Sequence, residues 1–94
     1  MTTRVKLSDG STLLIYQTTG PSSYDATNGY TVTLPCTKVL DVIAISVGGG
    51  YVAGAPSLSA NQVTFHIYVS GGTEVTGGAD LSGQAVRIVA IVAD

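Results

Sequence analysis

The chain has 94 residues, which is enough for one domain and too few for two. Its hydrophobic fraction of 45% is ordinary for a globular protein and argues against disorder. The net charge is −2, and the four basic residues cannot neutralise many phosphates, so the composition argues against nucleic acid as a partner.

The first 17 residues predict a β-hairpin. Residues 3–7 alternate, with Val5 and Leu7 on one face and the cations Arg4 and Lys6 on the other. A turn at Asp9-Gly10 leads into a second strand over 12–17. No apolar segment follows Met1, so we expect no secretory signal. The longest apolar run, 88–93, is too short for a membrane-spanning helix, and we expect no membrane partner.

A polar loop over 18–29 precedes strands expected at 30–34, 39–47 and 51–55. The strand 39–47 is apolar on both faces, which is typical of a strand that is central or covered on each side. One face holds Val39, Ile43, Ile45 and Val47 with Asp41, and the other holds Leu40, Val42 and Ala44.

The clearest strand signal covers 62–69, where apolar and polar residues alternate, and a last strand covers 84–93. No window has the 3.6-residue period of an amphipathic helix. We therefore predict an all-β, single-domain β-sandwich or β-barrel of about seven or eight short antiparallel strands. Within the domain 1–94, residues 1–17 form an N-terminal hairpin or arm and 24–94 the main sandwich. The expected core holds Val63, Phe65, Ile67, Val42 or Ile43, and Val86 or Ile88.

Groups that carry out catalysis are sparse. His66 is the only histidine, and its place in an alternating strand favours the solvent or interface face. No Gly-x-Ser-x-Gly motif is present, and nothing supports Cys36 and His66 as a nucleophile and base. As the single cysteine, Cys36 cannot form an intrachain disulfide and is typical of a small buried hydrophobe. We expect neither an enzyme nor a cofactor.

Three binding motifs have simpler explanations. The run Gly48-Gly49-Gly50 could cradle a phosphate, but no Lys or helix follows it, which favours a flexible connection. Calcium could bind the loop from Glu74 to Asp80 if Asp9 or Asp25 lay beside it, although no Asp-x-Asp pattern exists. The tyrosines could form a sugar-binding platform, but tyrosine is also common in strands for packing. They are Tyr16, Tyr24, Tyr30, Tyr51 and Tyr68.

The low charge content is the most informative feature. Only 11% of the residues are charged, and the strands 39–47 and 84–93 carry one charge each, Asp41 and Arg87. Exposed strand edges are normally protected by charge or proline, so such a surface suits permanent contact with other subunits. We expect the protein to work as an oligomer or within a lattice. Arg4 and Lys6, half of all the basic residues, are the candidate interface with a partner outside the domain.

The order of motifs over about residues 24–94 resembles that of small virion proteins encoded among the head genes of tailed phages. The segments that carry it are 30–34 (YTVTL), 37–43 (TKVLDVI), 61–65 (NQVTF), 78–83 (GADLSG) and 86–91 (VRIVAI). The resemblance implies a capsid decoration (cement) protein on the virion surface, assembled in the host cytoplasm, whose partner is the major capsid protein or another virion protein. It also implies a homo-oligomer, a trimer or dimer. It implies no catalytic residues. A tail, collar or head-fibre base module and a carbohydrate-binding β-sandwich remain alternatives.

Overall fold

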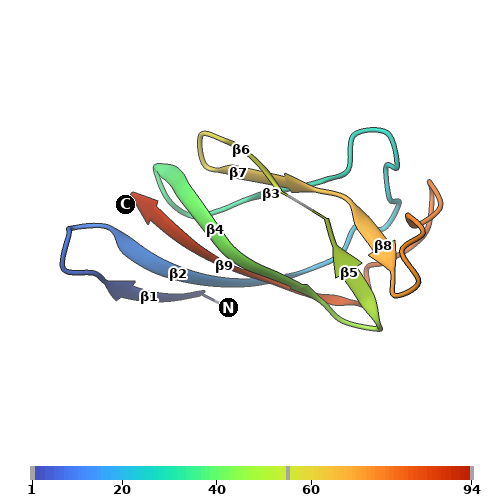
Figure 1. The fold of residues 1–94 in the computed structure, drawn as a ribbon, viewed down its shortest axis with the longest axis horizontal. Helices are drawn as coiled ribbons and strands as arrows, with labels where there is room; N and C mark the ends of the chain where they lie inside the picture. Colours follow the sequence, from blue (N-terminus) through green and yellow to red (C-terminus); the bar gives the residue numbers. More distant parts are fainter. Residues whose placement is uncertain (1, 55, 94) are drawn as a thin grey trace.

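The computed structural model describes residues 2–54 and 56–93, and Met1, Ala55 and Asp94 lie outside the described residues. The chain is an all-β single small domain, and no helix occurs over the described residues. Figure 1 shows the strands of this part of the chain. They are β1 (Thr2–Lys6), β2 (Thr12–Thr19), β3 (Tyr30–Thr33), β4 (Lys38–Val47), β5 (Tyr51–Ala53), β6 (Ser57–Ser59), β7 (Gln62–Phe65), β8 (Ile67–Val69) and β9 (Ala85–Ala93).

Two antiparallel sheets are stacked as a sandwich, with the smaller sheet above the larger one in Figure 1. The larger sheet has the order β1-β2-β9-β4, and the smaller sheet has the order β3-β7-β6. The β5-β8 pair extends the second layer at one end. Because β2 pairs with β9 from Thr12–Val92 to Thr19–Ala85, the N-terminal hairpin is built into the larger sheet.

The core lies between the two layers and follows the predicted alternation of β7 and β9. Val63, Phe65 and Ile67 are fully buried. They belong to the same hydrophobic cluster as the inward side chains of β9, which are also fully buried. Those are Val86, Ile88, Ala90 and Val92. The ring of Tyr30 packs edge-on against Phe65, with 5.8 Å between the ring centroids.

Strand β4 differs from the sequence prediction, because it is an edge strand of the larger sheet and contains two register shifts. The shifts, between Val39 and Asp41 and between Val42 and Ala44, each place an extra residue in β4. The residues that face the core are therefore Val39, Val42, Ile45 and Val47. Of the two alternatives expected for the core, Val42 packs against it. Ile43 is 57% exposed, so its expected place on one face with Val39, Ile45 and Val47 is wrong.

Two other segments depart from the expectations in smaller ways. The predicted strand 51–55 is observed as β5 over Tyr51–Ala53, and Ala55 lies outside the described residues. Strand β6 was not predicted, because Ser57-Leu58-Ser59 has too few apolar residues to give a periodic signal. The glycine run connects β4 to β5, and the positive φ angles of Gly49 and Gly50, 73° and 83°, fit the expected turn.

Truncation of Phe65 tests this core. We expect Phe65→Ala to lower the free energy of unfolding by about 3–5 kcal/mol, because it removes a fully buried ring and leaves a cavity. Urea denaturation followed by circular dichroism measures the change. Ser59→Ala, at an exposed position of β6, is the control. Its free energy of unfolding should stay within about 0.5 kcal/mol of the wild-type value. A similar small loss for Phe65→Ala would contradict the assigned face of β7.

Candidate functional site: the outward face of the larger sheet

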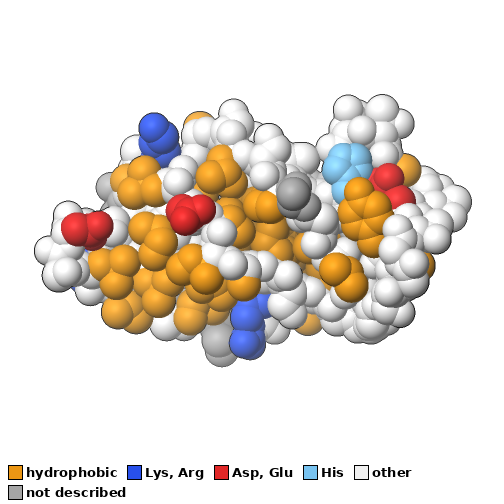
Figure 2. All heavy atoms as spheres, viewed as in Figure 1, with side chains coloured by type: hydrophobic (Ala, Val, Ile, Leu, Met, Phe, Trp, Pro, Cys, Tyr) orange, Lys and Arg blue, Asp and Glu red, His pale blue; other side chains and the backbone are white. Residues whose placement is uncertain are grey.

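The side of the larger sheet that points away from the core is apolar across its strands. In register, Val5 of β1 lies beside Leu13 of β2, and Leu13 lies beside Ile91 of β9. In the next row Ile15 lies beside Val89. We call this surface the outward face. It consists of Val5, Leu13, Ile15, Leu40, Ile43, Ala44, Val89 and Ile91. Figure 2 shows it as a broad patch of hydrophobic side chains with few charges near it.

The two bulges of β4 enlarge this apolar surface. At one bulge Leu40 and Asp41 lie opposite the single residue Ile91, and at the other Ile43 and Ala44 lie opposite Val89. All four β4 residues are exposed, and Leu40 is 49% exposed. In a regular strand without bulges, some of these four side chains would point toward the core. The bulges therefore add apolar side chains to the outward face at an edge of the sheet.

One acid and one base flank the apolar centre. Asp41 lies in the row of Ile91, and it makes no hydrogen bond or ion pair with a described residue. Arg87 lies four residues from Ile91 along β9, beside Gln17 and Ser46. Its Nη2 donates to the Gln17 side-chain oxygen at 3.5 Å. The charges are therefore separated along the strands, with the row of Ile15 and Val89 between them.

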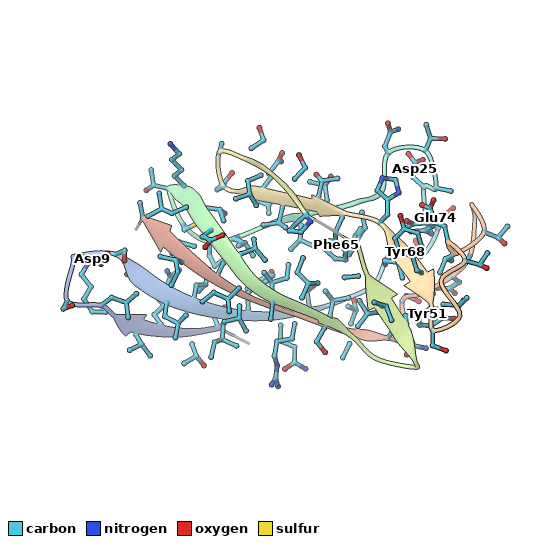
Figure 3. The ribbon with its side chains drawn as sticks, in the orientation of Figure 1. Asp9, Asp25, Tyr51, Phe65, Tyr68 and Glu74 are labelled. Carbon is cyan, nitrogen blue, oxygen red and sulfur yellow. The ribbon has the colours of Figure 1, made fainter. Side chains whose placement is uncertain are left out.

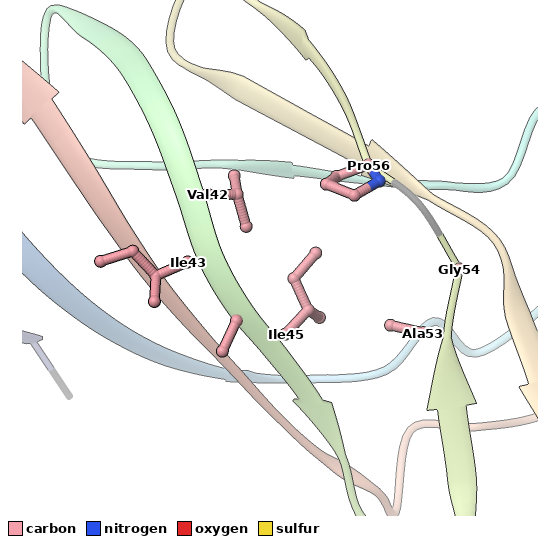
Figure 4. A pocket seen from close by; sticks show the side chains of 7 residues that line it. Val42, Ile43, Ile45, Ala53, Gly54 and Pro56 are labelled. Atoms are coloured by element: carbon pink, nitrogen blue, oxygen red, sulfur yellow. The ribbon is translucent and has the colours of Figure 1, made fainter.

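A hollow of about 240 Å³ lies at the free edge of β4, between this strand and the segment that follows β5 (Figure 4). Its walls contain no titratable side chain. They are formed by Val42, Ile43, Ala44, Ile45, Ala53, Gly54 and Pro56. The bulges interrupt the ladder of β4 beside this hollow, which makes the edge a poor template for another strand. The hollow offers apolar contact and no groups for acid–base chemistry.

The titratable side chains that contact one another lie near the β8 end of the sandwich. The Tyr24 hydroxyl donates to Glu74 Oε2 at 2.8 Å and accepts the backbone N–H of Ile67 at 2.8 Å. His66 Nδ1 lies 2.6 Å from the same Glu74 oxygen. These hydrogen bonds from His66 and Tyr24 hold the pKa of Glu74 below its ordinary value. Burial raises the pKa of Tyr24 to about 12, so its hydroxyl keeps its proton and remains a donor.

This cluster has a structural explanation. Tyr24 is 2% exposed, and its hydroxyl joins the loop after β2 to both β8 and the loop that carries Glu74. His66 and Glu74 are about one-third exposed. The cluster therefore fastens two loops to the sandwich, where an isolated bridge between Tyr68 and Glu74 also holds the second loop.

Three acids are used in turns. Asp9, Asp25 and Asp80 each accept hydrogen bonds from a Ser or Thr two residues later, and Asp25 also accepts from Asn28. These bonds lower the pKa of each carboxyl group. Asp9 and Glu74 lie at opposite ends of the molecule (Figure 3). Among the described residues, no group of three or more His, Cys, Asp or Glu side chains is placed to hold a metal ion.

The candidate interface residues Arg4 and Lys6 are exposed on β1, on the opposite side of that strand from Val5. Arg4 Nη2 donates to the backbone carbonyl of Pro35, which joins the N-terminal strand to the loop before β4. Arg4 therefore has a contact inside its own domain, and Lys6 is exposed at the end of β1. Of the expected arm over 1–7, Met1 lies outside the described residues.

The tyrosines and the cysteine serve mainly in packing. Tyr16, Tyr30 and Tyr51 pack against the core, and the Tyr30 hydroxyl donates to the Thr19 carbonyl at 2.8 Å. Tyr51 and Tyr68 lie on the paired strands β5 and β8, at the end labelled in Figure 3. Cys36 is half-buried against the core, as the sequence favoured. A sugar-binding platform would require several exposed rings on one surface.

Sequence reasoning did not identify the outward face as a surface. The signal was present in Leu13-Leu14-Ile15-Tyr16, which is apolar at consecutive positions and so must be apolar on both sides of β2. Leu14 is fully buried, while Leu13 and Ile15 are half-buried on the opposite side.

Comparison with protein-family models, curated proteins and solved structures found no match for this chain. The described part of the chain contains no helix with the length and apolar character needed to cross a membrane. The surface of the domain itself therefore carries the evidence about function.

Removal of one hydroxyl tests the structural explanation of the polar cluster. We expect Tyr24→Phe to lower the free energy of unfolding by about 1–3 kcal/mol, because the buried Ile67 N–H loses its acceptor. Thermal and urea unfolding measure the loss. Tyr68→Phe is the control, since the Tyr68 hydroxyl makes no hydrogen bond to a described residue. Equal stabilities of the two variants would show that the cluster does not fasten these loops.

Proposed function

We propose that this protein is a non-catalytic assembly module of a virion, and specifically a capsid decoration protein that binds the outside of a tailed-phage shell. The observation that carries the proposal is the apolar outward face of the sheet β1-β2-β9-β4. A surface of this kind is expected where other protein subunits cover it, because a sheet normally presents polar residues to solvent. The resemblance of the motif order to phage head proteins supports the particular setting.

The distribution of polar groups supports a binding role. Asp9, Asp25 and Asp80 are used in turns, and Glu74 is held by Tyr24 and His66. The ionic groups that remain at the sheet surface are few, so apolar contact is the main interaction that the outward face offers. A decoration protein needs only such contacts, since it acts by holding neighbouring subunits together.

The proposed place of the protein on the capsid is tested by purifying the native particle and imaging it by electron microscopy. A decoration protein contributes density to the outer surface of the shell, in a copy number comparable to that of the major capsid protein. A tail, collar or head-fibre base module would instead occur in a few copies at one vertex. Absence of the protein from the particle would contradict the proposal.

A charge placed on the outward face tests the docking surface. We expect Ile43→Lys to reduce occupancy on the shell at least about tenfold, because the interface would have to desolvate an unpaired ammonium group. The protein should still fold, since Ile43 is 57% exposed. Val52→Lys is a matched control: Val52 is 51% exposed, but it lies in the β5-β8 strand pair. Equal occupancy of the two variants would contradict docking through the outward face.

Arg4 and Lys6 give a second, electrostatic contact that we place against an acidic region of the capsid. Replacing both with Gln should weaken shell binding at low salt and flatten its dependence on salt, because exposed charges steer docking and are screened by ions. Co-sedimentation with shells at low and high salt measures both effects. Unchanged occupancy and an unchanged salt dependence would show that β1 is only a solvated edge strand.

A further inference from the structure

We propose that the outward face binds a second copy of this chain through a two-fold axis that runs across the strands at the row of Ile15, Val89 and Ala44. In this dimer Asp41 of each copy pairs with Arg87 of the other. The inference rests on the proposed assembly function, and it names a second copy as the subunit that covers this surface, so that the dimer is the unit that binds the shell.

The size of the face fits a small specific interface. The strands lie about 4.8 Å apart and rise about 3.3 Å per residue, so seven residues from each of β2, β9 and β4 and the five of β1 give a flat area of about 400 Å² per copy. Two copies together cover about 800 Å² in projection. Because protruding side chains have more accessible surface than a flat plane, the buried accessible area is near the roughly 1,000 Å² of the smallest specific complexes. The expected assembly is therefore a dimer whose population depends on concentration.

The positions of the two charges select the geometry. Ile91 and Asp41 lie two residues to one side of the row of Val89, and Arg87 lies two residues to the other side. A two-fold axis across the strands at this row places Arg87 of one copy over Ile91 of its partner. The apolar stem of Arg87 then packs on Ile91, and its guanidinium reaches the neighbouring Asp41. The symmetry produces this ion pair twice.

Two other face-to-face arrangements place the charges badly. An axis along the strands, midway between β2 and β9, superposes β4 on β1 and places Asp41 over Val5. That arrangement would bury a carboxylate against an apolar side chain. An axis across the strands at the row of Ile91 brings the two copies of Asp41 together, and like charges repel. Of the three arrangements, the axis at the row of Val89 is the one that separates like charges and joins opposite ones.

Charge reversal provides the test, because a two-fold axis makes a specific prediction about mixtures. Asp41→Arg alone and Arg87→Asp alone each create two like-charged pairs, and each should weaken the dimer about a hundredfold. The double variant Asp41→Arg/Arg87→Asp should restore it. An equimolar mixture of the two single variants should also dimerise, because a mixed dimer has two opposite-charged pairs. Sedimentation equilibrium and cross-linking of isotope-labelled copies measure these species.

Circular dichroism checks that each variant is folded, and both positions are exposed in β4 and β9. Dimerisation of the mixture without dimerisation of either single variant would support the two-fold arrangement. A wild-type protein that stays monomeric, or a mixture that fails to associate, would overturn it. The shell occupancy of Ile43→Lys is a separate measurement. If that occupancy falls and the wild-type protein alone is monomeric, the outward face binds the shell directly. In that case the proposed function stands, and the second copy is the wrong partner.

Discussion

The pairing of β9 on both of its edges is the constraint on which the rest of the structure depends. This strand lies between β2 and β4, and its alternate side chains are fully buried beneath the smaller sheet. The register with β2 fixes the N-terminal hairpin in the same sheet, and the register with β4 places the two bulges. Since every second residue of a strand points the other way, Val89 and Ile91 must face outward once Ile88 and Ala90 face inward. The apolar outward face is thus a direct consequence of a strand that is apolar at consecutive positions.

The elements with strict alternation were predictable from sequence, and the elements whose geometry depends on a distant partner were not. Val63, Phe65 and Ile67 alternate with polar residues, and their burial follows from period two alone. The bulges of β4 depend on how ten residues match the shorter segment of β9, which no local pattern of β4 reveals. This is why Ile43 was placed on the same face as Val39, Ile45 and Val47. The contact between Tyr24 and Glu74 joins residues 50 positions apart, and no local pattern can predict such a contact. Both regions that were missed lie where the chain departs from regular pairing.

The bulges of β4 also bear on the proposed assembly function. An edge strand with few charges is a liability for a soluble protein, and β4 carries only Lys38 and Asp41. The bulges interrupt its ladder and also turn Leu40 and Ile43 outward, so protection of the edge and enlargement of the apolar face have one structural cause. At the opposite edge, β1 presents Arg4 and Lys6. The domain therefore combines one apolar face with one basic edge, which is an arrangement suited to assembly beside an acidic surface.

The central proposal is that other protein subunits cover the outward face in the assembled state. Solvent paramagnetic relaxation enhancement of methyl groups, measured by NMR with a soluble probe in dilute and in assembled protein, tests it directly. We expect Leu40 and Ile43 to lose their strong relaxation on assembly, while Val52 and Val69, which are 51% and 41% exposed in the β5-β8 strand pair, keep theirs. Protection of Val52 and Val69 with Leu40 and Ile43 still exposed to the probe would contradict the account.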